Sequence, residues 1–286
     1  PTLFKDDAKV ASVGSTSLRA TLSMVAFNEG MKECNPRLNN HMEASEIVTT
    51  MIRPQKSACN KNYSPAEEKE YKAFLEREVY SKLMDWGWKQ DFSHCKKVLF
   101  TDSDKFFAMI DEHPFKVISN IYKRLAFMQN LNWHDRSFVD SVFTAAERHA
   151  IYKYETYRLF CIFAGTSLPD SGKYFASMDI LVNDIIKYAD LAIEGKNSAS
   201  ADLRFGHDYT VIASLATMQV EGKCARVENF DTLKDEWVDF IVTPMATNLQ
   251  WIFYRNKEGK VLVKLLHNEQ ECRLPIDSPT APYYAW

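Results

Sequence analysis

Apolar residues follow two different spacings along this chain of 286 residues. Between about residues 64 and 195 they recur every three or four positions, which is the spacing that places them on one face of a helix. Near the end of the chain they form two short runs, rich in β-branched and aromatic side chains, on either side of a loop that contains Gly259. These runs predict an antiparallel hairpin from residues 248–255 and 261–266.

The first helix of the middle region has the clearest start. Ser64 can cap it, Pro65 suits its first turn, and Glu67 follows three positions after the serine. Gly, Pro and Asn residues then interrupt the apolar pattern several times. The predicted helical segments are 67–87, 106–111, 113–131, 138–161 and 174–193.

Near the start of the chain, residues 14–30 have the pattern of a further helix. Ser15 or Ser17 can cap its start, and Gly30 suits its end. Arg19 then lies in or near the first turn, where the helix dipole opposes a cation by about 0.3–1 kcal/mol. Either the guanidinium has an anion to bind, or Arg19 is an ordinary surface arginine. The apolar positions on one face of this helix are Leu18, Leu22, Val25 and Ala26.

The stretch between this helix and residue 63 is rich in Asn and Pro. A strand is possible over residues 46–52, where β-branched residues are frequent. A basic patch of Arg53, Lys56 and Lys61 follows it. Such a patch is usually a solvated surface, and binding of a charged substrate is the alternative.

Residues 203–210, L-R-F-G-H-D-Y-T, predict a strand that ends before a helix. His207 and Asp208 then lie at the helix start. The first N–H groups of a helix have no partner inside it, and the helix dipole is positive there, so a phosphoryl oxygen can bind at this point. His207 adds a hydrogen-bond donor, and Asp208 adds a proton.

Composition excludes several classes of function. With 46% hydrophobic and 26% charged residues, the chain can bury a full core. A net charge of −3 argues against a nucleic-acid partner bound through a general basic field. No apolar run is long enough to span a bilayer, so we expect no membrane partner.

The six cysteines occur singly, without a C-x-x-C pair, which argues against a zinc ribbon or a thioredoxin-type site. Scattered core thiols are one interpretation. The even number also permits disulfides in an oxidising compartment. The cysteines are Cys34, Cys59, Cys95, Cys161, Cys224 and Cys272.

Residues 201–210, A-D-L-R-F-G-H-D-Y-T, resemble the C-terminal active-site motif of the histidine acid phosphatases. Residues 143–157 and 175–190 are similar to helices of the multiple inositol polyphosphate phosphatase branch of that family. S-T-S-L-R-A-T-L-S-M, residues 15–24, resembles the segment in which the family carries a phosphate-binding arginine, and Arg19 occupies that place.

The resemblance implies a fold and a division into domains. The fold is α/β, with a phosphoglycerate-mutase-like α/β core and an inserted all-helical domain. Residues 1–63 and 196–286 would form the discontinuous core domain. Residues 64–195 would form the helical insertion.

The resemblance also implies a function. The chain would be a phosphomonoester hydrolase, periplasmic or secreted, that acts on inositol polyphosphates such as phytate without a metal or other cofactor. His207 and Arg19 would bind the transferring phosphate, and Asp208 would protonate the leaving oxygen and later activate water. The branch usually carries His-Ala-Glu. Here Asp208 follows the histidine directly and Tyr209 takes the Glu place, which resembles the His-Asp form of the phytases and general acid phosphatases.

The family's R-H-G-x-R-x-P motif, which supplies the nucleophilic histidine, does not occur in the sequence. The nearest text, Arg148-His149-Ala150, falls in the middle of a predicted helix and is interpreted as structural. We therefore expect an N-terminal portion to be missing, the nucleophile of the phosphohistidine intermediate to lie outside this chain, and the isolated chain to have no turnover. The alternative is a non-catalytic truncated or degenerate homologue that binds polyanions.

A second His-Asp pair, His134-Asp135, gives a rival hypothesis. With His113 and Asp179 it could belong to a metal-dependent phosphohydrolase of the helical His-Asp class. Asp135 is better interpreted as the cap of the following helix, because a metal site needs more ligands in register than this spacing offers.

Overall fold

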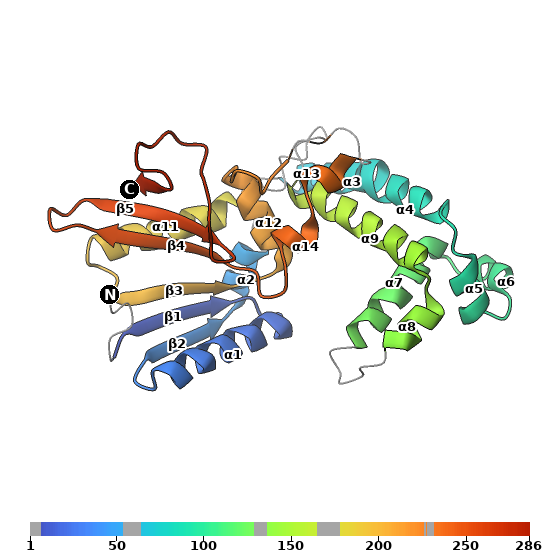
Figure 1. The fold of residues 1–286 in the computed structure, drawn as a ribbon, viewed down its shortest axis with the longest axis horizontal. Helices are drawn as coiled ribbons and strands as arrows, with labels where there is room; N and C mark the ends of the chain where they lie inside the picture. The colour runs from blue at the N-terminus through green and yellow to red at the C-terminus, as the bar shows by residue number, and fades with distance from the viewer. Residues whose placement is uncertain (1–6, 54–63, 129–135, 165–177, 226, 228–231) are drawn as a thin grey trace. The chain divides into compact units, whose positions relative to one another are not determined.

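The chain divides into two compact units (Figure 1). The first unit combines Pro1–Glu67 with Ile162–Trp286, and the second unit is Glu68–Cys161. The computed structural model describes residues 7–53, 64–128, 136–164, 178–225, 227 and 232–286.

The first unit contains a parallel sheet of three strands in the order β2-β1-β3. Gly14 at the end of β1 pairs with Ala44 on one neighbouring strand and with Phe205 on the other. All three strands therefore end at the same edge of the sheet, the edge at which open α/β sheets usually bind their ligands. The strands are β1 (Lys9–Gly14), β2 (Asn39–Ala44) and β3 (Ala199–Phe205).

A helix begins directly after each of these strands, which confirms the predicted strand-to-helix step at His207. The helices are α1 (Leu18–Cys34) after β1, α2 (Glu46–Ile52) after β2 and α12 (Asp208–Thr217) after β3.

A fourth helix, α11 (Asp179–Ile193), contacts α2 and α12 and precedes β3. It therefore belongs to the first unit. The helical unit ends near Cys161, not at residue 195, because α11 packs on the helices of the sheet domain. The part of the predicted segment 174–193 before residue 178 lies outside the described residues.

The predicted C-terminal hairpin is confirmed. β4 (Leu249–Arg255) pairs antiparallel with β5 (Val261–His267) around a loop that contains Gly259. Two short strands, β6 (Gln270–Glu271) and β7 (Tyr283–Ala285), also pair with β5. The segment before the hairpin holds two four-residue helices, α13 (Leu233–Glu236) and α14 (Asp239–Val242).

The regular structure of the second unit is helical in the residues described, and α3 begins at Pro65 as predicted. A π-helical turn (Phe160–Ala164) follows its last helix. The preceding elements are α3 (Pro65–Leu75), a π-helical turn (Glu76–Tyr80), α4 (Ser81–Trp88), α5 (Ser93–Leu99), α6 (Ser103–Ala108), α7 (Pro114–Phe127), α8 (Arg136–Val142) and α9 (Ala145–Leu159).

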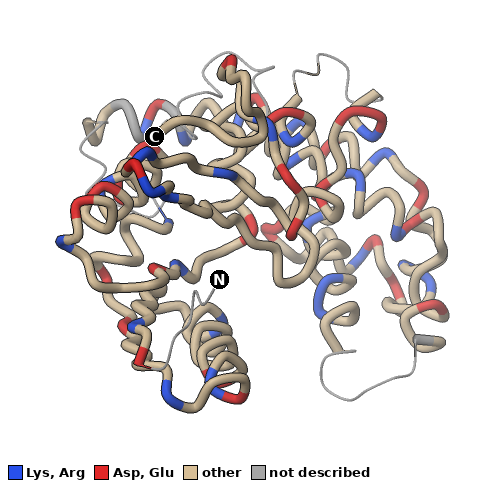
Figure 2. The backbone as a smooth tube through the Cα atoms, turned by 60° about the vertical axis from the view of Figure 1, so that its left-hand side comes forward, with Lys and Arg blue, Asp and Glu red and all other residues tan. Residues whose placement is uncertain are grey.

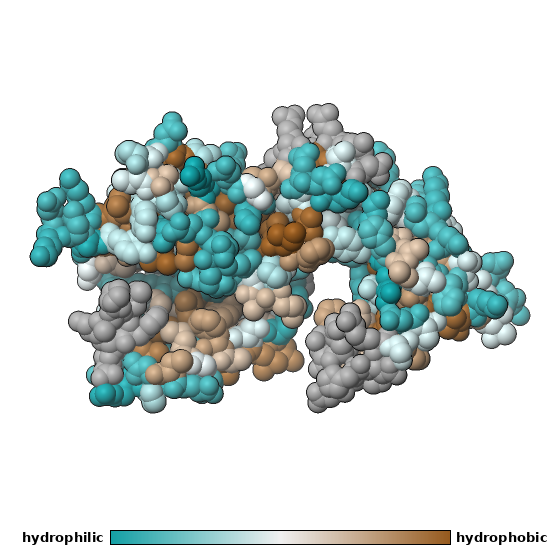
Figure 3. Space-filling view, viewed as in Figure 1, coloured by the Kyte–Doolittle hydropathy of each residue, from teal (hydrophilic) through white to brown (hydrophobic). Residues whose placement is uncertain are grey.

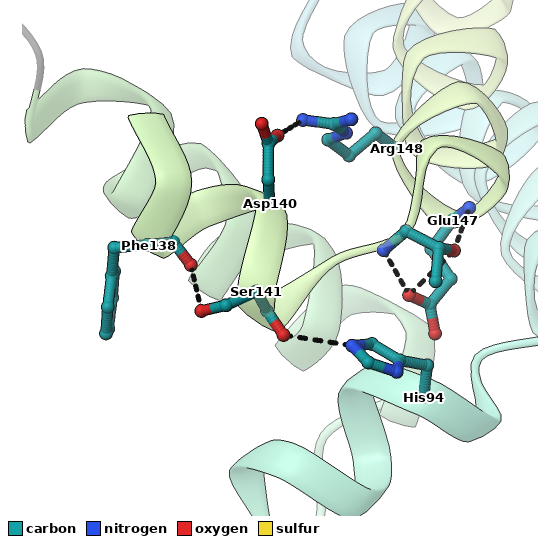
Figure 4. Close-up of polar contacts among 7 residues, drawn as sticks. His94, Phe138, Asp140, Ser141, Glu147 and Arg148 are labelled. Atoms are coloured by element: carbon teal, nitrogen blue, oxygen red, sulfur yellow. Dashed lines mark hydrogen bonds and ion pairs between the residues drawn. The ribbon is translucent and has the colours of Figure 1, made fainter. Parts of the chain in front are cut away.

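The predicted helix 138–161 is divided into α8 and α9 by a capping box. Thr144 caps α9, and Glu147 Oε2 accepts a hydrogen bond from Thr144 N at 2.8 Å (Figure 4). Glu147 Oε1 also accepts from Cys95 N of α5 at 2.9 Å. This buried carboxylate therefore satisfies helix-start N–H groups of two helices at once.

Arg148 and His149 lie within α9, as the sequence predicts. Arg148 forms an ion pair with Asp140 of α8, and His94 Nε2 of α5 donates to the Ser141 carbonyl at 2.9 Å (Figure 4). These contacts hold α8 against its neighbours. Arg148-His149-Ala150, the segment most similar to the nucleophile motif, therefore lies in a packing helix of the second unit.

Two elements near the N-terminus differ from the prediction. Residues 46–52 form helix α2 and not a strand, because Ser45 Oγ caps Val48 N and the Thr49 hydroxyl donates to Ser45 O at 2.8 Å. The strand is the polar stretch β2, which the sequence did not predict. It lies at the edge of the sheet, where polar strands are tolerated.

The first predicted helix is α1, which continues past Gly30. Its predicted apolar face is not the buried one: Leu18 is 73% and Leu22 58% exposed, and Figure 3 shows apolar side chains on the surface over this helix. The side that packs on the sheet is partly polar, because Asn28 Oδ1 accepts from Ser12 Oγ of β1 at 3.1 Å. The buried positions of α1 are Ala20, Met24 and Asn28.

Residues of both charge signs are interspersed in each unit (Figure 2). Among the described helices, none has the combination of length and apolar composition that crossing a bilayer requires. Five cysteines are described and all are free thiols, while Cys59 lies outside the described residues. Burial raises the pKa of Cys95 and of Cys161 to about 12, as expected for core thiols.

Gly206, between β3 and α12, allows Ile52 to pack at close range, because a Cβ at this position would clash with Ile52 Cγ2. Ile52 is fully buried. We expect Gly206→Ala to lower the free energy of unfolding of the chain by about 1–3 kcal/mol, since an overpacked core must shift. Urea unfolding followed by circular dichroism measures the change.

Gly30→Ala is the matched control in the same unit, because an added methyl group there meets no atom within 4 Å. Alanine is the better helix former, so this substitution should raise the free energy of unfolding by about 0.5–1 kcal/mol. A similar effect of the two substitutions would contradict the close packing at Gly206.

Candidate functional site

Two helices start side by side at the carboxyl edge of the parallel sheet. β1 and β3 are neighbours, and Ser15 N donates to Phe205 O at 3.2 Å just beyond the paired residues. Ser17 and His207 are the N-cap residues of α1 and α12, and neither side chain caps its own helix. The positive ends of two helix dipoles therefore lie at one edge, which favours binding of an anion.

Arg19 and His207 meet at this edge, as the sequence predicts. Arg19 Nη2 lies 3.1 Å from His207 Nδ1, and Ser15 Oγ lies 3.3 Å from His207 Nε2. A guanidinium has only N–H donors, so Nδ1 must accept in this contact. The neutral ring then carries its proton on Nε2 and donates it to Ser15. His207 is buried, which holds the imidazole in this position.

This arrangement suits an oxyanion. An anion that contacts both Arg19 and His207 would accept from the guanidinium, and from Nδ1 once the ring gains a second proton and this nitrogen no longer accepts from Arg19. The helix starts add backbone N–H groups to the same position. The geometry therefore provides cationic donors without a metal ion, and a phosphate or a sulfate has the matching charge.

Tyr209 sets the plane of the imidazole. Its ring stacks on His207 with centroids 4.9 Å apart and planes at 19°, and on Phe163 with centroids 5.3 Å apart and planes at 22°. Burial raises the pKa of the Tyr209 hydroxyl, and the nearby charges of Arg53 and Arg19 act in the opposite direction. Sequence reasoning gave Tyr209 only a place in the motif, because Phe163 is far away along the chain.

Hydrogen bonds from α2 hold the loop between β1 and α1. Thr16 N donates to Thr49 Oγ1 at 2.8 Å, and Thr16 Oγ1 donates to Glu46 Oε1 at 2.7 Å. Thr210 Oγ1 in the first turn of α12 donates to Ile52 O at 2.8 Å. Helix α2 therefore connects the two helix starts of the site. The sequence did not predict this role, since it assigned residues 46–52 to a strand.

Asp208 is the first residue of α12 and is exposed. It lies next to His207 in the chain and at the same helix start, where a carboxylate is favoured by the dipole. The electrostatic effect of Asp208 reaches the neighbouring Tyr209 hydroxyl, whose pKa it raises.

Nothing in the described part of the chain places the four residues of the rival metal site near one another. His134 and Asp135 lie outside the described residues. His113 caps α7 in the second unit, and Asp179 begins α11 in the first. Within the described ranges, no group of three or more His, Cys, Asp or Glu side chains has the arrangement of a metal site.

No family model matches the chain, and no curated protein matches its sequence. Solved structures do match. The multiple inositol polyphosphate phosphatase of Bifidobacterium longum in complex with inositol hexasulfate has a TM-score of 0.70 at 18% identity, over 98% of this chain and 71% of that chain. Its apo form has a TM-score of 0.68, also at 18% identity, over 98% of this chain and 72% of that chain.

The phytase from D. castellii matches with a TM-score of 0.55 at 14% identity, over 94% of this chain and 54% of that chain. At such identities the similarity establishes the fold alone. The chain therefore has the fold of these two phosphatases, and the predicted α/β core with helical parts is confirmed.

The Arg19–His207 contact predicts the tautomer of the ring. Without an anion, neutral His207 should carry its proton on Nε2, because Arg19 can only donate to Nδ1. Two-dimensional ¹H–¹⁵N spectra of ¹⁵N-histidine-labelled chain at about pH 8.5, about two units above the ordinary pKa of histidine, report the protonated nitrogen. His207→Gln assigns the signal.

Arg19→Leu should remove the tautomer preference, because the donor to Nδ1 is lost. Lys260→Leu removes a cation that is exposed in the hairpin loop and should leave the His207 signal unchanged. A proton found on Nδ1 in the unsubstituted chain would show that the contact with Arg19 is not the one described.

Proposed function

We propose that this chain belongs to a phosphomonoester hydrolase of the histidine acid phosphatase type, which dephosphorylates inositol polyphosphates. The observation that carries the proposal is the meeting of Arg19 and His207 at the carboxyl edge of the sheet. The contact joins the two residues that the sequence resemblance assigns to one phosphate, although they are 188 positions apart in the chain. The fold is shared with two phosphatases of related substrate chemistry.

In the proposed reaction, Arg19 and His207 hold the transferring phosphoryl group and offset its charge. A histidine nucleophile attacks phosphorus while the bond to the leaving oxygen breaks, and Asp208 gives its proton to that oxygen. Water then attacks the phosphorus of the phosphohistidine while Asp208 takes up a proton from the water. The P–N bond breaks, which releases inorganic phosphate and frees the histidine. The nucleophile would come from residues outside the printed sequence, which holds no R-H-G-x-R-x-P motif.

The substrate class follows from the neighbours and from the site. The Bifidobacterium longum enzyme is named for inositol polyphosphates and was solved with inositol hexasulfate, and the D. castellii protein is a phytase. A site with two helix starts and an arginine favours small molecules of high negative charge. We therefore assign phytate and related inositol polyphosphates as substrates of this chain. A periplasmic or secreted location is part of the same proposal.

A second candidate is a non-catalytic homologue that binds polyanions at the same position. The absence of the nucleophile motif from the sequence favours it. The two candidates share the anion site and differ only in turnover. Binding therefore tests the site in the isolated chain, and turnover tests the enzyme once the R-H-G-x-R-x-P segment is present.

We expect the isolated chain to bind inorganic phosphate at a position shared by Arg19 and His207. Arg19→Gln and His207→Gln should each weaken binding at least about tenfold, because a hydrogen bond to a charged group contributes about 1.5–3 kcal/mol. Isothermal titration calorimetry at fixed salt concentration measures the affinity.

Lys260→Gln is the control, since it removes an exposed cation of the β4–β5 loop and should leave the affinity nearly unchanged. A crystal soaked in phosphate should place the ion against both Arg19 and His207. An ion bound elsewhere, together with unaltered affinity of both variants, would rule out this site.

Asp208→Asn tests the acid in a protein that also carries the R-H-G-x-R-x-P segment. Protonation of a leaving alkoxide contributes roughly 10²–10⁴-fold to the rate, so this variant should lose most turnover on inositol phosphates. On p-nitrophenyl phosphate, whose leaving group scarcely needs a proton, formation of the phosphoenzyme should be affected much less. Rapid-quench measurement of the phosphoenzyme separates the two steps. Equal losses on both substrates would exclude Asp208 as the acid.

A further inference from the structure

Arg53 lies beside Tyr209 at the same edge of the sheet. Its guanidinium carbon is 5.8 Å from the centre of the Tyr209 ring, within the range of a cation–π contact. Arg53 is the C-cap residue of α2, and the neighbouring Ile52 is fixed to α12 by the bond from Thr210. The position of Arg53 is therefore set by the same contacts that hold the Arg19–His207 site.

The polar atoms of this pair are not satisfied within the protein. Arg53 Nε and the Tyr209 hydroxyl are buried, and neither has a partner at ordinary hydrogen-bond distance among the described residues, although the Arg53 guanidinium lies near enough to lower the pKa of the Tyr209 hydroxyl. Burying donors without acceptors costs about 1–3 kcal/mol each, so such a pair is expected where a ligand supplies the acceptors.

The two atoms have the chemistry of an anion site. The phenol O–H and the guanidinium N–H groups are both donors, and a phosphate oxygen can accept from both. The positive charges of Arg53 and Arg19 both lower the pKa of the Tyr209 hydroxyl, in opposition to burial, which raises it. His207 contacts the other arginine and stacks on the Tyr209 ring. The Arg53–Tyr209 pair is therefore the neighbour of the first anion position.

We propose that Arg53 and Tyr209 form a second phosphate-binding position beside that of Arg19 and His207. The site would then take a small molecule that carries at least two phosphate groups, one in each position. This inference rests on the proposed function, because the first position is the one assigned there to the transferring phosphate. Tyr209 has two roles: its ring orients His207, and its hydroxyl binds the second phosphate.

A comparison of two ligands separates the positions. Each inorganic phosphate ion fills one position at a time, whereas a single molecule of myo-inositol hexakisphosphate can span both. Calorimetric titrations of the full chain with each ligand would be made for Arg53→Gln, Tyr209→Phe and Arg19→Gln. Lys260→Gln is the control for the loss of one positive charge, and circular dichroism checks that each variant is folded.

Arg53→Gln should weaken binding of the hexakisphosphate about tenfold and leave the affinity of inorganic phosphate for the Arg19–His207 position unchanged, because a charge-assisted bond is lost only at the second position. Tyr209→Phe keeps the stacked ring and should weaken only the hexakisphosphate, by about threefold or more. Arg53→Lys should give an intermediate loss, since lysine lacks the planar fork. Arg19→Gln should weaken both ligands.

An equal loss of both ligands in Arg53→Gln would mean that Arg53 contacts the same phosphate as Arg19, and would overturn the second position. So would unaltered hexakisphosphate affinity in Arg53→Gln and Tyr209→Phe. In both cases a loss in Arg19→Gln leaves the proposed function standing. If the unsubstituted chain binds neither ligand, or Arg19→Gln binds both as tightly, the proposed function fails and this inference fails with it.

Discussion

The parallel pairing of β1 with β3 is the constraint on which the rest of the first unit depends. Because Gly14 pairs with Phe205, the chain leaves both strands at the same level, and the helices that follow must begin next to each other. Arg19, the second residue of α1, then reaches His207 at the start of α12. A shift of this pairing by one residue would turn every side chain of β3 to the opposite face, and the site would be lost.

Several weaker interactions hold Arg19 and His207 in contact in the first unit. The Tyr209 and Phe163 rings fix the imidazole, and α2 connects the loop before α1 to the start of α12. The second unit uses one carboxylate, Glu147, in the same manner, since it receives N–H groups from two helices. In each unit, then, one residue or element contacts segments that are distant in sequence. The local pattern of apolar residues does not predict these long-range contacts.

The sequence predicted those parts of the structure whose signals are local. The step from strand to helix at His207 and the C-terminal hairpin follow from short runs of residues, and the approach of Arg19 to His207 follows from a resemblance that spans both segments. The errors arose where a long-range contact outweighed local preference. Residues 46–52 are rich in β-branched side chains, yet the Ser45 cap and the packing of Ile52 make them a helix. The buried side of α1 includes Asn28, which hydrophobicity alone assigns to the surface. The stack on Tyr209 required knowledge of which distant ring lies beside it.

The contact between Arg19 and His207 also has a thermodynamic consequence. Any anion that binds the folded site and not the unfolded chain adds to the stability of the first unit by mass action, about 2.7 kcal/mol at a concentration one hundred times its dissociation constant. The second unit contributes none of the residues of this site, so the gain does not act on it directly. If phosphate binds as proposed, its concentration would set the balance of stability between the two halves of the chain, and the resistance of each half to heat or proteolysis would depend on the ligand that the protein meets.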